Sequence, residues 1–243
     1  GEIYPVLYTS SHNCKGIQLL LDYICEFIPS PLERNFRYSD AANCSNEESL
    51  SSDKNGTAFI FKTIADPFVG KLSFVKVLSG SLSVNSSIYN ANKKKEEKIN
   101  SIYSIRGKEQ TVTDLIEVGD IGVIAKLQYS NTNDTLCDKA TPIIVQHQSC
   151  DMPTFERVVV VMKKADEDKV LSALTKIQEE DPSIVVYRDE EFLELRIIGM
   201  GETHLDIIKS KLEAKFGITI EFELPSVPYR ETIKGHADVQ GRY

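Results

Sequence analysis

The order of hydrophobic patterns between residues 157 and 223 constrains the fold of this chain more than any other feature of its sequence. Two segments repeat apolar residues at helical spacing, and four shorter segments are rich in β-branched residues. The expected helices lie at 166–180 and 202–216, and the expected strands lie at 157–162, 184–187, 192–198 and 218–223. This order, β-α-β-β-α-β, predicts a ferredoxin-like domain over residues 151–225.

Turn residues set the limits of the two helices. Asp181-Pro182 ends the first, because proline lacks an N–H donor and clashes with a continuing helical turn. Gly217 is the expected C-cap of the second. Three leucine and isoleucine side chains of the second helix share one face, and we expect that face to pack on the sheet. The expected contacts join Leu205, Ile208 and Leu212 to Leu193, Leu195 and Ile197, with Arg196 exposed on the opposite face of the sheet.

Residues 57–150 carry short strand patterns and no helix-length periodic segment. The clearest strand patterns lie at 58–64, 71–77 and 121–127. Turn signals separate them at Asp66-Pro67, Ser79-Gly80, Gly107 and Gly119-Asp120. Many short strands at close intervals predict a small antiparallel β-barrel. A joint between the barrel and the ferredoxin-like domain is expected near residues 149–153.

The first 56 residues offer little for a core of their own. A strand at 3–7 and a helix at 16–28 cannot close a core, so residues 1–34 are expected to be the last piece of an α/β domain. Residues 35–56 are rich in Asn and Ser, and this composition predicts a mobile polar linker because it cannot offset the entropy of ordering. The predicted fold class is therefore α+β multidomain: a strand-helix remnant, a barrel and a ferredoxin-like domain.

Composition excludes several broad classes of protein. The formal net charge is −8, which argues against nucleic-acid binding through a generally basic surface. A local basic face remains compatible with RNA contact, since screening limits the reach of each charge to about 10 Å. No apolar run approaches the roughly 20 residues of a membrane span. Five widely spaced cysteines without a C-x-x-C pair indicate reduced thiols in a cytoplasmic protein.

Motifs for catalysis are absent from the sequence. There is no G-x-x-x-x-G-K-[ST] phosphate loop, no G-x-S-x-G nucleophile elbow and no H-E-x-x-H metal motif. The four histidines are scattered along the chain, at His12, His147, His204 and His236. We therefore expect this chain to have no catalytic residues, no metal site and no cofactor of its own.

Several short strings resemble the elongation factor G family in order and spacing. The strings that resemble the second domain of that family are Asp66-Pro67-Phe68-Val69-Gly70-Lys71-Leu72, Ser79-Gly80, Gly119-Asp120 and Asp134-Thr135-Leu136-Cys137-Asp138. Those that resemble its third domain are Glu179-Glu180-Asp181-Pro182 and Gly199-Met200-Gly201-Glu202-Thr203-His204-Leu205. The string from Val227 to Ile233 resembles the entry to its fourth domain, so residues 226–243 are expected to begin that domain.

The resemblance implies a GTPase that drives movement of transfer RNA and messenger RNA on the ribosome. It implies that the second domain contacts small-subunit ribosomal RNA. The third domain would lie between the protein's own GTPase domain and a small-subunit protein near the decoding centre, and it would relay conformational change. GTP and Mg²⁺ are implied for the full-length parent and not for this chain. A monomeric chain without membrane contact is expected.

The resemblance also suggests candidate contact residues. Ser10-Ser11-His12 stands in the place of the family's guanine-contacting loop, although an ordinary strand-to-helix turn is the better description here, since the remaining nucleotide site is absent. The run Lys93-Lys94-Lys95 is expected at a hairpin tip, either in solvent or facing RNA, and Glu96-Glu97 weakens the RNA interpretation. Arg188, Arg196 and His204 could contact the ribosome or another domain, or could be ordinary solvated side chains.

Two alternatives to a translocase remain open at this stage. A ribosomal protection protein of the tetracycline-resistance type shares the same domains. A freestanding ferredoxin-like binding module with an accessory barrel would need a complete N-terminal region, whereas residues 3–28 look severed. Thr203 stands where the family usually has leucine, which indicates a divergent paralogue of the main factor.

Overall fold

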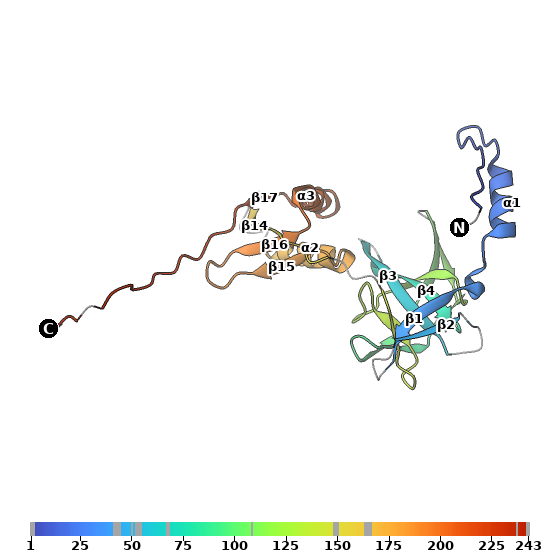
Figure 1. Ribbon diagram of the computed structural model, residues 1–243, viewed down its shortest axis with the longest axis horizontal. Coiled ribbons are helices and arrows are strands. Elements are labelled where there is room, and N and C mark those ends of the chain that lie inside the picture. Colours follow the sequence, from blue (N-terminus) through green and yellow to red (C-terminus); the bar gives the residue numbers. More distant parts are fainter. Residues whose placement is uncertain are drawn as a thin grey trace. The chain divides into compact units, whose positions relative to one another are not determined.

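The structure is a computed structural model in which the chain divides into two compact units, Gly1–Gln148 and Ser149–Tyr243 (Figure 1). It describes residues 3–40, 45–49, 51, 55–66, 69–107, 109–147, 151–162, 167–236 and 238–241. The parts of our predictions that fall outside these residues concern Gly1, Cys44, Pro67, Phe68, Ser149, Cys150, Asp166 and Tyr243. The expected combination of helices with mostly antiparallel sheets is confirmed.

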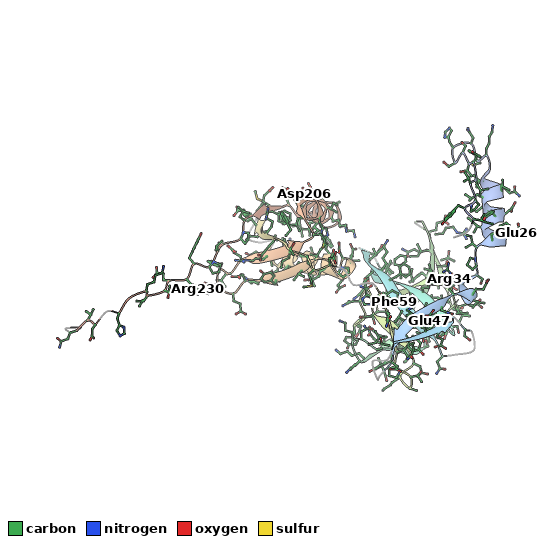
Figure 2. The ribbon with its side chains drawn as sticks, in the orientation of Figure 1. Glu26, Arg34, Glu47, Phe59, Asp206 and Arg230 are labelled. Atoms are coloured by element: carbon green, nitrogen blue, oxygen red, sulfur yellow. The ribbon has the colours of Figure 1, made fainter. Side chains whose placement is uncertain are left out.

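The first unit begins with helix α1 (Ile17–Phe27), close to the predicted bounds. The helix ends at Ile28, which is extended, and Pro31 then starts a short 3₁₀ turn, η1 (Pro31–Glu33), that Ser30 caps. No residue of α1 is buried, and its side chains, Glu26 among them, project freely in Figure 2. The predicted strand at 3–7 is wrong: no described strand pairs with it, and a strand without a partner leaves its backbone groups unpaired.

The predicted linker at 35–56 is also wrong over its described part. Strands β1 (Asn35–Ser39) and β2 (Ser45–Ser49) form an antiparallel hairpin, and β1 also pairs with β13 (Ile144–Val145). The alternation of Phe36 and Tyr38 explains this result. Phe36 is buried against Leu78 and Val145, so two aromatic side chains anchor a segment whose other residues are mostly polar.

The largest sheet of the first unit has eight antiparallel strands in the order β7-β6-β12-β3-β4-β11-β8-β9. Their bounds are β3 Thr57–Asp66, β4 Gly70–Ser79, β6 Ser87–Asn90, β7 Lys95–Lys98, β8 Ile102–Arg106, β9 Glu109–Thr113, β11 Ile121–Ala125 and β12 Thr135–Cys137. A two-stranded sheet joins β5 (Leu82–Ser83) to β10 (Leu115–Ile116). The strands predicted at 58–64, 71–77 and 121–127 are confirmed as β3, β4 and β11. The last ends two residues early, because Lys126 adopts a left-handed conformation with φ 61°.

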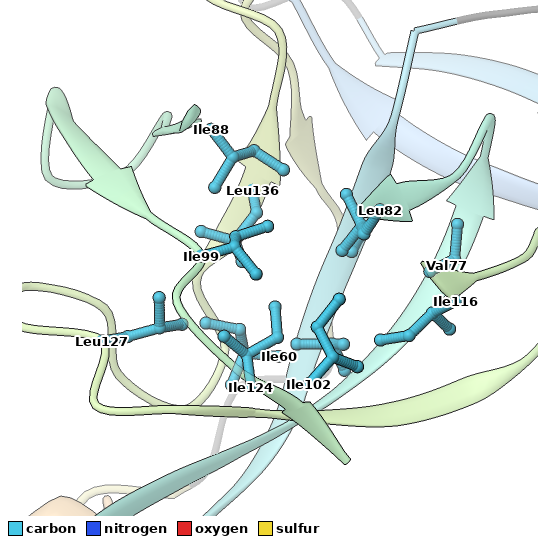
Figure 3. Packing of buried hydrophobic residues seen from close by; sticks show 12 residues of the cluster. Ile60, Val77, Leu82, Ile88, Ile99, Ile102, Ile116, Ile124, Leu127 and Leu136 are labelled. Atoms are coloured by element: carbon cyan, nitrogen blue, oxygen red, sulfur yellow. The ribbon is translucent and has the colours of Figure 1, made fainter. Parts of the chain in front are cut away.

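These strands enclose a core of aliphatic side chains (Figure 3). Ile60, Ile102 and Ile124 are fully buried at its centre. They come from three different strands, and Ile60 and Ile102 alternate with exposed or half-buried neighbours, as the two-residue repeat of a strand requires, whereas both neighbours of Ile124 are buried. The core therefore fixes which face of each strand points outward.

The second unit contains the predicted order of two helices and four strands. The antiparallel sheet runs β15-β16-β14-β17, and both helices contribute to a core on the sheet. The bounds are β14 Phe155–Val161, α2 Glu167–Glu180, β15 Val185–Arg188, β16 Leu195–Gly199, α3 Glu202–Phe216 and β17 Ile220–Glu223. Gly217 caps α3 with φ 66°, as predicted. In the described part of the chain, no helix is long and apolar enough to cross a membrane.

The predicted packing of α3 is confirmed except at Leu193. Leu205, Ile208 and Leu212 are buried in the same core as Ile197. Leu193, however, is 68% exposed and has φ 55°, because the turn between β15 and β16 extends as far as Glu194. The Asp189 side chain accepts hydrogen bonds from the backbone N–H groups of Glu191 and Phe192. These bonds keep residues 191 and 192 in the turn, so the strand begins later than the expected residue 192.

We expect Leu205→Ala to lower the free energy of unfolding of the second unit by about 2–5 kcal/mol, the range for emptying a buried leucine site. Ile207 lies on the same helix and is 50% exposed, so Ile207→Ala is the matched control and should cost less than about 1 kcal/mol. Urea unfolding followed by circular dichroism measures both. Equal losses in the two variants would contradict the packing described here.

Candidate interaction surfaces

The β6–β7 hairpin carries the run Lys93-Lys94-Lys95 at its tip, as predicted. Asn90 and Lys95 face each other across the hairpin, and the Asn90 side chain accepts a hydrogen bond from the Lys93 backbone N–H at 2.9 Å. Lys94 has φ 55°, which closes the turn. All three lysines are exposed, and the Lys95 ammonium lies 4.1 Å from the centre of the Tyr129 ring. The tip is a compact cationic surface with one aromatic neighbour.

Glu97 anchors this hairpin from inside the unit. Although it belongs to a charged run expected in solvent, it is only 4% exposed, which corrects the prediction for this residue. Its Oε1 accepts hydrogen bonds from Tyr129 N, Ser130 N and Ser130 Oγ, and its Oε2 accepts one from Gln128 N. The strand repeat explains the burial, since Glu97 faces inward between two exposed neighbours on β7.

A second buried group extends the network to the following loop. The Asn90 amide donates to Ser130 Oγ at 2.8 Å and to Asp134 Oδ2 at 2.9 Å. Asp134 Oδ2 also accepts from Asn131 N. Because each of these polar atoms has partners, the loop at 128–134 is fixed to the base of the lysine hairpin.

The positions of the two glutamates strengthen the case for a cationic tip. Glu96 pairs with Lys139 at 2.6 Å, and Glu97 is enclosed by backbone and hydroxyl donors. Neither carboxylate pairs with Lys93, Lys94 or Lys95 in any described contact. The two acidic residues that weakened the RNA interpretation are thus turned toward other partners.

Ser10-Ser11-His12 forms a closed turn at the start of α1. Ser10 and Lys15 exchange two backbone hydrogen bonds, at 2.9 and 3.2 Å. Gly16 follows with φ 72°, and a Cβ there would lie 2.4 Å from the Tyr8 carbonyl oxygen. Ser11 and His12 are exposed, and no described contact joins them to the lysine hairpin.

Arg196 departs most from its prediction. It was expected on an exposed sheet face, yet it is 7% exposed and lies among three carboxylates. Its guanidinium nitrogens approach Glu194 at 2.8 Å, Glu156 at 3.4 Å and Asp189 at 3.7 Å. The pattern of alternation placed Arg196 on the correct face, but it could not show that acidic side chains from a neighbouring strand and turn would cover it.

The Arg196 cluster also holds the segment that follows β17. Arg196 donates to the Ser226 carbonyl oxygen at 3.2 Å, and Ser226 Oγ donates to Glu194 at 2.6 Å. That hydrogen bond is the main reason that the pKa of Glu194 lies below its usual range. Arg230, labelled in Figure 2, pairs with Glu191 farther along the segment at 2.7 Å. Arg196 is therefore a fastening point within its own unit.

His204 and Arg188 have different surroundings. His204 Nδ1 accepts from Met200 N at 3.1 Å, so Nε2 carries the proton and donates to Asp181 Oδ2 at 3.0 Å. Burial alone would raise the pKa of Asp181, but hydrogen bonds from Ser183 and then His204 outweigh it and lower the pKa. Arg188 is exposed on β15. No group of three or more potential metal ligands occurs among the described residues.

Comparison with known proteins gives the same family for both units. A family model described as elongation factor G domain 2 matches residues 55–139, and one described as elongation factor G, domain III, matches residues 151–224. Elongation factor G of Thermotoga maritima is 37% identical over 247 residues, covering 100% of this chain. A crystal structure of a Thermus thermophilus protein matches 90% of the chain with a TM-score of 0.70 and 29% identity. The chain spans 35% of the first relative and 31% of the second.

We expect Glu97→Gln to destabilise the first unit by about 1–3 kcal/mol, because the new amide turns an N–H₂ group toward backbone donors. Glu96→Gln, one residue away on the surface, should cost less than about 1 kcal/mol. Chemical denaturation compares the two variants. Similar midpoints for both would show that the Glu97 network does not hold the hairpin.

We expect Arg196→Ala to destabilise the second unit by about 2–4 kcal/mol, slightly below the usual range for breaking a buried ion pair because the carboxylates are partly exposed. Arg188→Ala is the matched control and should cost less than about 0.5 kcal/mol. Hydrogen exchange should also become faster around Ser226 in the first variant alone. An unchanged unfolding midpoint for Arg196→Ala would refute this role.

Proposed function

Because this chain belongs to the elongation factor G family, we propose that its parent protein is a GTP-hydrolysing translocase of the ribosome and that this chain supplies ribosome-binding and relay domains. One observation carries the proposal. The models of two successive elongation factor G domains match in family order, over 55–139 and 151–224, and a curated elongation factor G aligns with the whole chain.

The finer architecture forms part of this proposal. We assign residues 57–150 to a translation-factor β-barrel, supported by the eight antiparallel strands around one aliphatic core. We assign residues 151–225 to a ferredoxin-like domain, supported by the strand order β15-β16-β14-β17 with two helices contributing to one core. Residues 1–34 would belong to the GTPase domain of the parent, 35–56 to its connection with the barrel, and 226–243 to the start of a fourth domain.

The chemistry of GTP hydrolysis would belong to the parent. GTP and Mg²⁺ need a phosphate loop and metal-binding hydroxyls, and the sequence of this chain contains no such loop. Ser10, Ser11 and His12 would contribute at most backbone groups beside the guanine base. The work of the present residues would be to bind and to transmit movement in the cytoplasm.

Ribosome contact is best supported at the lysine hairpin. Three exposed lysines project from a turn that buried Glu97 and Asn90 hold in place, and a fixed cationic surface suits a phosphate backbone. In the second unit, Arg196 and His204 have partners inside the fold, so they would support a rigid relay rather than reach a partner. Arg188 remains free of any described ion pair and is the better contact residue there.

We expect the chain to sediment with ribosomes in a salt-dependent manner. The double variant Lys93→Glu with Lys94→Glu should weaken this binding at least about tenfold, because each contact with phosphate contributes to affinity and to its salt dependence. Lys211→Glu with Lys234→Glu makes the same change of charge in the second unit and is the matched control. Binding that is insensitive to the hairpin variant, or equally sensitive to the control, would contradict the proposal.

A further inference from the structure

A row of five side chains crosses the first unit on the side opposite its core. Strand pairing places Lys62 of β3, Phe74 of β4, Val123 of β11, Tyr103 of β8 and Val112 of β9 directly opposite one another in turn. Three of their sequence neighbours, Val75, Ile124 and Ile102, belong to the aliphatic core, as the strand repeat requires. We call the surface around this row the outer face.

A β-bulge enriches the outer face in aromatic side chains. Pairing shifts by one residue between Ile60 and Lys62, so Phe61 is an extra residue that joins Lys62 beside Phe74. The Phe61 and Phe74 ring centres are 6.3 Å apart, and the Lys62 ammonium lies 5.7 Å from the centre of the Phe74 ring. Phe61 remains 40% exposed despite these contacts.

The outer face is more apolar than a surface that meets only water. Three residues on this side of the sheet, Leu72, Val123 and Ala125, are themselves buried and form a second cluster with half-buried neighbours that include Phe74 and Tyr103. Ile121 is 52% exposed and Val112 is 70% exposed at its margins. Exposed apolar side chains around one such cluster, rather than scattered single residues, indicate an interaction site.

Charge indicates the kind of partner. Beside the first row, Lys76 lies opposite Ile121, and Leu72 lies between Ile64 and Ala125. These rows carry Lys62 and Lys76 and no carboxylate, and Asp66 follows at the end of β3, opposite Gly70. The first unit, Gly1–Gln148, contains fifteen Lys and Arg against seventeen Asp and Glu, whereas the second unit, Ser149–Tyr243, contains thirteen against nineteen. A polyanion would therefore meet less repulsion at the first unit than at the second.

We propose that the outer face is a stacking platform for unpaired RNA bases, with Phe61 and Phe74 contacting bases and Lys62 and Lys76 contacting phosphates. The proposal rests on the proposed function, since ribosomal RNA would supply the looped strand. Aromatic rings flanked by cations are the combination that binds single-stranded nucleic acid without strong sequence preference. A purely apolar protein partner would instead bury the Lys62 ammonium at the end of the row without a group to pair with its charge.

The test uses the whole chain and a short fluorescein-labelled oligouridylate, followed by fluorescence anisotropy at low salt. Phe61→Leu keeps an apolar side chain but removes the ring, and we expect it to weaken binding about fivefold to tenfold. Phe61→Tyr should bind as the unmodified chain does. Lys62→Ala should weaken binding and reduce the slope of log affinity against log salt by about 0.7.

Matched controls lie outside the outer face. Tyr229 is 90% exposed in the segment after β17, so Tyr229→Leu should leave affinity unchanged, as should Lys234→Ala. Absence of saturable binding, or equal affinity for Phe61→Leu and Phe61→Tyr, would overturn the proposal. Self-association that Phe61→Leu abolishes, without RNA binding, would reassign the outer face to protein contact.

This assay fails or succeeds independently of ribosome binding. The lysine hairpin belongs to β6 and β7, at the opposite end of the strand order from β8 and β9. The double variant of Lys93 and Lys94 should therefore retain at least half of its oligouridylate affinity. If it loses oligouridylate binding entirely while Phe61→Leu retains it, the hairpin and not the outer face binds RNA, and the proposal is overturned.

Discussion

The backbone pairing of β3 with β4 is the constraint on which the rest of the first unit depends. It is the longest ladder among the described residues and contains the bulge at Phe61. On one side of the ladder, Ile60 and Val75 enter the aliphatic core. On the other, the same register aligns Lys62 with Phe74 and leads to the outer face. A slip of one residue would exchange the two sides, so burial of the core also determines which aromatic and cationic groups are presented to solvent.

Each unit contains a charged side chain, Glu97 or Arg196, that is buried and needs partners for its charge. The two units supply these partners in different ways. Glu97 is satisfied by neutral donors, three of them backbone N–H groups of one loop, and this fixes a local segment with little dependence on other charges. Arg196 is satisfied by three carboxylates from β14 and the β15–β16 turn, together with one carbonyl group beyond β17. The first arrangement holds one hairpin and its loop. The second joins four separate parts of the second unit, and removing its central cation would leave like charges facing one another.

Much of the fold follows from the sequence because periodicity reports burial on one face of an element. The helices α2 and α3 and the strands β3, β4 and β14 lie within a few residues of their predicted bounds. The failures have a common physical origin. The β1–β2 hairpin depends on two aromatic residues that pack on a distant strand, Leu193 depends on a side-chain cap by Asp189, and the burial of Glu97 and Arg196 depends on partners far away in sequence. Local composition identifies these residues as polar or irregular, but it cannot name the groups that will enclose them. The lysine hairpin was predictable, whereas the outer face required the register of five strands.

The fastening of Ser226 to Arg196 has a mechanical consequence. In the sheet order, β17 lies at an edge, and a pull on the chain that leaves it at Glu223 would peel the strand away one hydrogen bond at a time. Arg196 belongs to β16 and donates a hydrogen bond to the carbonyl group of Ser226, so a pull on the later residues also acts on β16. This strand has a neighbouring strand on both sides. The load would then be shared between the edge strand and the middle of the sheet. A lever attached beyond Ser226 would turn about a stiff pivot, and the whole second unit would move with it.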